Sequence, residues 1–255
     1  MRKILIALLA TASVTTLLSG CGGSIDPADA YKGESPRYIY QKGQSALRDK
    51  SYSEAVKRFE ALDVQYPFES ETERAQLYLI YAYYMKEDYT LAVTAADRYV
   101  RLHPTSPSVD YAYYMRGISN YYQNLGIFER LFTVDLATRD LTQIKKSFGD
   151  FSEVTLRFPS SKYAPSAQQY LVYLRNVLAN HELHIARYYY ERKAYIAAAN
   201  RASDVVAFYQ GAPQTVDALV LMAKSYHKLG LTKLEQDTLT VLHYNYPSMK
   251  VDYSS

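Results

Sequence analysis

The segments YSEAVKRFEALDVQYP (residues 52–67) and YTLAVTAADRYVRLHP (residues 89–104) are two copies of one pattern, 37 residues apart. Their small and apolar positions follow one another at steps of 3 or 4 residues, which places them on one face of a helix. Each copy closes on a proline, a residue that a helix interior does not tolerate. The matched positions are Tyr52, Ala55, Phe59, Leu62 and Pro67 in the first copy, and Tyr89, Ala92, Ala96, Tyr99 and Pro104 in the second.

Further copies of the pattern occur along the chain. They comprise Ser147, Phe151, Val154 and Pro159, then Tyr195, Ala198, Ala202 and Val205, and in degraded form Leu239, Leu242 and Pro247. Another helical run precedes each of these helices, at residues 38–48, 73–86, 109–123, 164–192 and 216–229, and the fourth of these runs is long enough for two helices. The sequence therefore predicts an array of helix–turn–helix units without strands.

This array resembles the tetratricopeptide repeat. The small residue that this repeat needs early in its second helix falls on Ala55, Ala92 and Ala198, and Gly43 and Gly117 take the matching position in first helices. We expect an all-α fold, a right-handed solenoid of about five repeats and about ten helices. An insertion of about eighteen residues, around 124–142, separates the two helices of the third repeat, and insertions in solenoids often lie on the binding face.

The first twenty residues are typical of an export signal, with a basic start and an apolar stretch too short to span a bilayer. The stretch ends in Leu18-Ser19-Gly20-Cys21, which resembles the bacterial lipobox and implies cleavage after Gly20 and acylation of Cys21. Three acyl chains there would anchor the protein stably. Gly22, standing where an inner-membrane retention signal would have Asp, favours the outer membrane. The alternative is a general secretion signal with a chance cysteine.

The expected organisation follows from these features. Residues 1–20 are the lipoprotein signal peptide, and residues 21–36 are the acylated cysteine with a flexible tether rich in Gly, Ser, Pro and Asp. The N-terminal half of the repeats, including the inserted loop of repeat three, spans 37–142. The C-terminal half spans 143–247, and 248–255 is a tail.

Composition excludes several classes of function. The net charge of +3 falls to +1 once the signal, with Arg2 and Lys3, is removed, so there is no electrostatic case for nucleic acid. One Cys excludes an internal disulfide and a cysteine-rich metal site. His181 and His184 stand at i and i+3, whereas the zinc-protease helix has its histidines at i and i+4. No phosphate loop or catalytic spacing occurs, so we expect no enzyme, no metal and no cofactor.

The sequence is unusually rich in tyrosine, with 28 residues of this type. Eight tyrosines lie on the predicted first helices of repeats two and three, namely Tyr81, Tyr83, Tyr84, Tyr111, Tyr113, Tyr114, Tyr121 and Tyr122. Neighbours on a helix diverge by about 100°, so we expect roughly half in the core and half lining a concave groove. Tyrosine suits an extended peptide. Candidates for this client groove are Tyr81, Tyr84 and Tyr114, with Arg98, Arg101 and Arg116 to receive carboxylates. The alternative is that the arginines are solvated helix charges.

Longer blocks of the sequence are similar to the BamD/ComL family, lipoproteins of the outer-membrane β-barrel assembly machinery. The likeness runs from about Ser35 to Leu242. The blocks that carry it are residues 65–68, 79–84, 110–117, 135–140, 148–151, 158–163, 171–174, 188–192 and 194–201. A generic repeat protein would share only the Ala, Gly and Pro positions.

The resemblance implies a scaffold on the periplasmic face of the outer membrane, held by its lipid. Its C-terminal repeats would dock on the POTRA domains of BamA, beside other lipoproteins of the machinery. Its N-terminal repeats would receive the C-terminal segments of unfolded outer-membrane proteins. Arg201, with Asn200 beside it, falls where the family has a partner-contacting arginine; the alternative is an ion pair or cap inside repeat four. Other possible functions are a lipoprotein accessory to pilus assembly, to Tol-Pal or to peptidoglycan-associated machinery.

Overall fold

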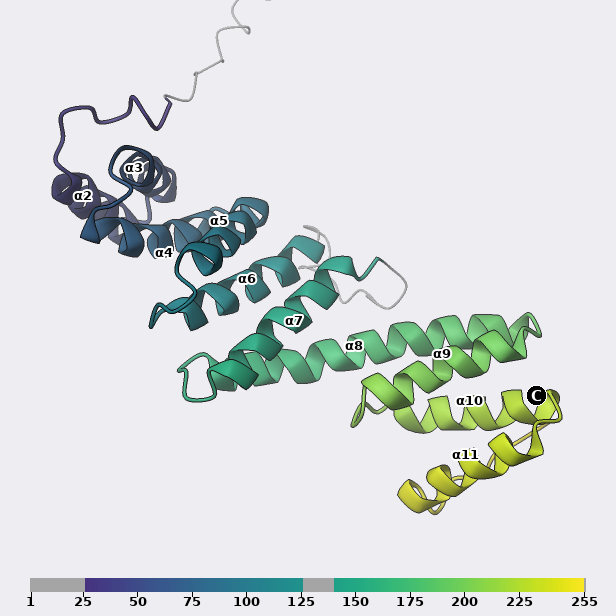
Figure 1. The fold of residues 1–255 in the computed structure, drawn as a ribbon. Helices are drawn as coiled ribbons and strands as arrows, with labels where there is room; N and C mark the ends of the chain where they lie inside the picture. Colours follow the sequence, from purple (N-terminus) through teal and green to yellow (C-terminus); the bar gives the residue numbers. More distant parts are fainter. Residues whose placement is uncertain (1–25, 126–139, 255) are drawn as a thin grey trace, which may run out of the picture. The chain divides into compact units, whose positions relative to one another are not determined.

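The computed structural model describes residues 26–125 and 140–254. The signal peptide, Cys21 and the family block at 135–139 lie outside these ranges. The described residues form ten α-helices and no strand (Figure 1). The helices are α2 (Pro36–Arg48), α3 (Tyr52–Gln65), α4 (Ser70–Met85), α5 (Tyr89–Leu102), α6 (Val109–Asn124), α7 (Thr142–Arg157), α8 (Ala164–Glu191), α9 (Tyr195–Phe208), α10 (Thr215–Lys228) and α11 (Thr232–Asn245).

Proline ends the second helix of four repeats, as the pattern predicts. A residue before proline is pushed out of the helical region by the proline ring. Accordingly, α3, α5, α7 and α11 all stop two residues before their proline, and the residue between has φ of −128° to −135° and a positive ψ. These residues are Tyr66, His103, Phe158 and Tyr246. The repeat boundaries are therefore set by local backbone sterics.

Glycine allows the two helices of a repeat to approach closely. A Cβ atom on Gly43 would lie 2.5 Å from the ring of Phe59, and one on Gly117 would lie 3.0 Å from the ring of Phe151. Both phenylalanine side chains are fully buried. The small residues predicted in the second helices, Ala55, Ala92 and Ala198, are fully buried as well. The tetratricopeptide-type fold class is thus confirmed at the contacts that define it.

The described residues form two compact units, one up to Ala75 and the other from Gln76 onward. In the first unit α2 packs on α3, and residues assigned to the tether also lie against α3. Tyr31 donates a hydrogen bond to Glu54, and its ring lies 4.0 Å from the guanidinium carbon of Arg58. Arg58 also pairs with Glu34 at 2.9 Å. At least this part of the tether segment is held on the first unit.

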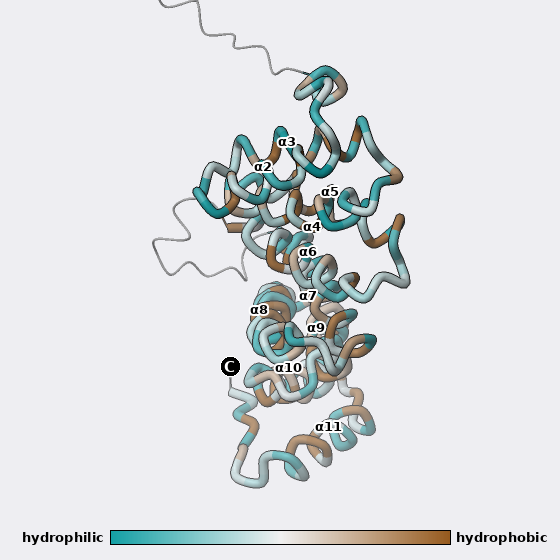
Figure 2. The backbone as a smooth tube through the Cα atoms, turned by 90° about the vertical axis from the view of Figure 1, so that its left-hand side faces the viewer, coloured by the Kyte–Doolittle hydropathy of each residue, from teal (hydrophilic) through white to brown (hydrophobic). Residues whose placement is uncertain are grey.

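In the second unit the helices from α5 to α11 pack in chain order, each on the next. Helix α8 is a single helix of 28 residues, where its length allowed two, and it contacts α7, α9 and α10. Apolar and polar residues alternate along α11, as the hydropathy colours in Figure 2 show. No helix of the described residues combines the length and apolarity that crossing a bilayer requires. The predicted insertion lies between the end of α6 and the start of α7, and its residues 126–139 are outside the described ranges.

Candidate interaction surfaces

The tyrosines of α4 and α6 form an aromatic layer with neighbouring helices. Of the eight predicted tyrosines, Tyr83 and Tyr113 are buried and the other six are partly buried. The ring of Tyr84 meets the rings of Tyr89 and Tyr122 edge-on, at centroid distances of 5.7 and 5.9 Å. These are favourable geometries for aromatic pairs. Burial, followed by the neighbouring Tyr122 and Tyr89 rings, raises the pKa of Tyr84. The hydroxyl therefore stays neutral at physiological pH.

Tyr114 is held from several sides. Its ring stacks on Tyr163 at 4.9 Å and meets Phe151 edge-on, and its hydroxyl lies 2.9 Å from that of Ser166. Tyr81, Tyr84 and Tyr114 all pack around one cluster of buried residues on α4, α5 and α6. The structure thus brings the three candidate tyrosines to a common core, with part of each side chain accessible.

The three candidate arginines have different surroundings. Arg98 and Arg101 are exposed on α5, and Arg101 pairs with Asp97 one turn away. Arg116 on α6 bridges two carboxylates, Asp97 at 2.7 Å and Asp150 at 2.6 Å, with its side chain only 18% exposed. The guanidinium of Arg116 is therefore already neutralised within the fold, whereas Arg98 and Arg101 face solvent.

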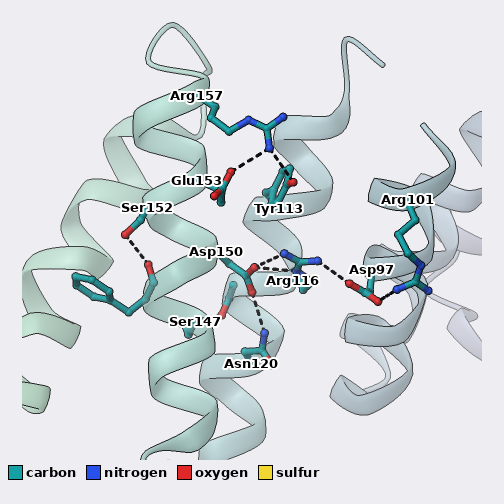
Figure 3. A network of polar contacts seen from close by, with 12 residues as sticks. Asp97, Arg101, Tyr113, Arg116, Asn120, Ser147, Asp150, Ser152, Glu153 and Arg157 are labelled. Atoms are coloured by element: carbon teal, nitrogen blue, oxygen red, sulfur yellow. Dashed lines mark hydrogen bonds and ion pairs between the residues drawn. The ribbon is translucent and has the colours of Figure 1, made fainter. Parts of the chain in front are cut away.

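Asp150 is the centre of this network, which Figure 3 shows between α5, α6 and α7. One of its oxygens accepts from Arg116, and the other accepts from the side-chain amide of Asn120 at 2.9 Å. Its side chain is 7% exposed. Burial raises the pKa of Asp150, although Arg116 and Asn120 act in the opposite direction. The buried Asp150 thus joins α7 to α6, and Arg116 extends the network to Asp97 on α5.

A second buried carboxylate lies under Arg201. Glu182 on α8 is 8% exposed, and its Oε2 lies 3.0 Å from Nη1 of Arg201, which is 44% exposed on α9. Its Oε1 lies 3.9 Å from Nζ of Lys145 on α7. Asn200 is exposed beside Arg201. The structure therefore contains the ion pair that was the alternative for Arg201, and it leaves much of that guanidinium accessible.

Sequence reasoning missed both Glu182 and Lys145 as parts of this surface. Glu182 was noticed only as the middle of a zinc-like pattern, between His181 and His184. In the structure Glu182 is buried while His184 is exposed, so the pattern does not converge on one point. Among the described residues no group of three or more His, Cys, Asp or Glu side chains is placed to hold a metal ion.

The first unit has a polar pocket that the sequence did not suggest. It has a volume of about 310 Å³ and lies between α2 and the start of α4. Its lining residues are Arg37, Tyr40, Gln41, Gln44, Ser70, Glu71 and Arg74. The two arginines act on Glu71, whose pKa is lowered first by a hydrogen bond from Ser70, then by its own backbone amide, and more weakly by the arginine charges. The lining carries one more positive than negative charge, which suits an anionic group.

Comparison with known proteins identifies the family of this chain. The YfiO family, described as outer membrane lipoproteins, matches residues 32–242, which includes nearly all of the repeats. The chain belongs to this family. Among YfiO relatives, one from Neisseria meningitidis serogroup A is 36% identical over 97% of this chain and 92% of its own length. One from Haemophilus influenzae is 37% identical over 96% and 92%. Both relatives are named outer membrane protein assembly factor BamD.

A solved structure is also similar to this protein. It is a kinesin light chain-type protein from Podosopora anserina with TPR-like repeats. It covers 83% of this chain and 96% of its own, at a TM-score of 0.41 and 13% identity. That level of similarity supports no conclusion about function.

Proposed function

We propose that this protein is a non-catalytic scaffold subunit of the outer-membrane β-barrel assembly machinery. The observation that carries the proposal is the family match over residues 32–242, together with relatives named as assembly factors that align over nine-tenths of their length. A repeat fold suits the role because its helices present broad surfaces to partners. The lipid on Cys21 holds the protein at the periplasmic face of the outer membrane, where confinement raises the effective concentration of its partners.

Arg201 and Asn200 form the proposed contact with the POTRA domains of BamA. Two features support this assignment: both residues are exposed, and the described ion pair of Arg201 is made through one of its nitrogens, Nη1, while the side chain is 44% exposed. An arginine fork makes bidentate contacts with carboxylates, so the partner residue is expected to be acidic.

Unfolded outer-membrane proteins are the proposed clients. Their C-terminal segments would lie on the partly accessible tyrosines Tyr81, Tyr84 and Tyr114. Arg98 and Arg101 are exposed and would receive the carboxylates of a client, while Arg116 would act by holding α6 against α7.

The first experiment is a detergent-extracted pull-down of the lipidated, C-terminally tagged protein, with mass spectrometry of the recovered proteins. Stoichiometric recovery of BamA and further lipoproteins of the machinery is expected. Recovery of pilus or Tol-Pal components without BamA would overturn the proposed function. In the same cells Cys21→Ala is expected to move the protein from the membrane fraction to the soluble fraction, and unchanged membrane association would contradict the lipid anchor.

Client binding is tested by reversing charge at Arg98 and Arg101 together and measuring the affinity for a peptide from the C-terminus of an outer-membrane protein. About a tenfold loss is expected, because charge-assisted hydrogen bonds contribute roughly 1.5–3 kcal/mol each when both partners face each other. Arg187→Glu is the matched control, since Arg187 is exposed and pairs with an aspartate as Arg101 does. Equal affinity in all three proteins would refute the arginine part of the groove.

A further inference from the structure

Glu182 lies beneath two cations that come from different helices. It belongs to α8, and α7 and α9 both pack on that helix (Figure 1). Its two oxygens are divided between the neighbours, Oε2 facing Arg201 of α9 and Oε1 facing Lys145 of α7. One buried carboxylate therefore holds the positions of a guanidinium and an ammonium group on the surface.

Glu182 contacts more cations than its single charge can neutralise. One negative charge faces two positive ones, and the cations are 44% and 56% exposed while Glu182 is 8% exposed. Within residues 26–125 and 140–254, Glu182 is the ion-pair partner of both cations. The exposed Asp140, just before α7, adds a second negative charge near Lys145: its pKa is lowered first by hydrogen bonds from Thr142 and more weakly by the Lys145 ammonium. Arg201 and Lys145 both keep part of their charged groups accessible at the surface, which suits an acidic partner.

Burying the Glu182 carboxylate costs free energy of folding, which its contacts with the two cations must offset. Desolvating a carboxylate costs several kcal/mol, and apolar residues of similar volume often stabilise a fold as well as a buried ion pair does. A buried charge does fix the direction of its partners. Glu182 accordingly orients the guanidinium of Arg201. An arginine whose guanidinium is already held by one nitrogen loses less side-chain entropy when its other nitrogens bind a ligand.

We infer that Glu182 is a positioning residue that presents Arg201 and Lys145 as a paired binding site for an acidic segment of a partner protein. The inference rests on the proposed function, because it takes BamA as that partner. It extends the contact surface from α9 to α7, and it assigns Lys145 a direct contact. Since both cations approach the same carboxylate, they are placed to bind neighbouring acidic side chains of one segment.

The test measures the affinity of the full-length protein for purified BamA with four variants: Glu182→Gln, Lys145→Glu, Arg201→Glu and Arg201→Ala. Lys145→Glu and Arg201→Glu are each expected to weaken binding at least tenfold and to reduce its salt dependence. Glu182→Gln is expected to weaken binding about fivefold. Removing the negative charge would by itself attract an acidic partner more strongly, so tighter binding by Glu182→Gln would overturn the inference.

A double mutant separates positioning from a merely structural role. In the Arg201→Ala background, where there is no guanidinium to orient, Glu182→Gln is expected to have much less effect on affinity. Glu182→Asp, which restores the charge on a shorter side chain, is expected to recover part of the loss. Glu153→Gln serves as the control, because Glu153 pairs with an arginine too, Arg157 one turn away on α7, but is 44% exposed.

The outcomes distinguish the inference from the function on which it rests. If the wild-type protein does not bind BamA, the proposed function is wrong. If it binds and Arg201→Glu weakens it, while Lys145→Glu and Glu182→Gln bind like the wild type, the function stands and the inference is wrong. Thermal unfolding of every variant shows whether a loss of affinity reflects a loss of folded protein.

Discussion

Two buried carboxylates, Asp150 and Glu182, each join an arginine on a neighbouring helix, and they differ in what lies around that arginine. Arg116 is 18% exposed and is contacted by two carboxylates. Arg201 is 44% exposed and is contacted by one. The second oxygen of Asp150 is occupied by a neutral amide, whereas that of Glu182 faces another cation. We call the Asp150–Arg116 pair closed, because its arginine is mostly buried between carboxylates, and the Glu182–Arg201 pair open, because its arginine stays accessible to solvent.

This difference separates a structural ion pair from one that is available to a partner. At the Asp150 site the charges of the arginine and its carboxylates are satisfied inside the fold, across α5, α6 and α7 (Figure 3). At the Glu182 site two cations share one buried carboxylate, and both reach solvent. The identity of the pair is thus a poor guide to its role, and the exposure of the arginine is a better one.

The largest expected effect is on stability at the closed site. Asp150→Ala leaves Arg116 mostly buried with only Asp97 to pair with, and breaking a buried pair costs about 3 kcal/mol or more. Urea unfolding followed by circular dichroism measures the loss. A change below about 1 kcal/mol, with an unaltered m-value, would show that the network is not structural.

A smaller loss is expected at the open site. Glu182→Ala should destabilise the fold by about 1–2 kcal/mol, because Arg201 and Lys145 are exposed enough to be hydrated when their partner is gone. The same unfolding experiment compares the two variants directly. Equal losses for Asp150→Ala and Glu182→Ala would remove the distinction between a closed and an open pair.

The pH dependence of stability sharpens the comparison from the Asp150 side. Burial raises the pKa of Asp150 above its unfolded value of about 3.9, so between the two values the folded protein binds the proton more tightly than the unfolded chain does. The contribution of this group to stability therefore falls as pH rises through that window. Asp150→Asn is expected to flatten this part of the curve, measured by urea unfolding between pH 3 and pH 7, and an unchanged slope would contradict the raised pKa.

The smallest effect is expected at an exposed pair. Glu153→Gln breaks the contact between Glu153 and Arg157, whose side chains are 44% and 49% exposed, and should change stability by about 0.5 kcal/mol or less. Arg157 keeps its hydrogen bond to the hydroxyl of Tyr113 at 2.9 Å. A larger loss in the same unfolding assay would mean that exposure does not rank these three pairs.

The sequence predicted the elements that depend on local sterics. Prolines and the 3-and-4 spacing located the second helices, and the closeness of Gly43 to Phe59 shows why a side chain there would not fit. The tyrosine expectation held less well: two of the eight are buried, rather than about half. Tyrosine combines an apolar ring with a polar hydroxyl, so most of these side chains lie partly buried at the boundary of the core.

The candidate surface was harder to predict because it depends on helix register in three dimensions. Lys145 and Glu182 are 37 residues apart along the chain, and Glu182 and Arg201 are 19 apart. The first separation equals the offset between the first two copies of the pattern, but neither residue stands at one of the positions that the copies share. Asp150 and Arg116 were likewise separate in the sequence, so the neutralisation of Arg116 was not foreseen. Charge pairs between helices follow from packing, which a single sequence does not display.

Helix α8 gives the second unit an unusual mechanical property. In most repeat proteins each hairpin can melt by itself, because it touches only its neighbours. Here one uninterrupted helix of 28 residues packs against α7, α9 and α10. Unfolding of one of these neighbouring helices would therefore expose a surface of α8, the helix against which the others also pack. Force applied across this unit is expected to rupture α7 through α10 in one event, and amide hydrogens along α8 should exchange together.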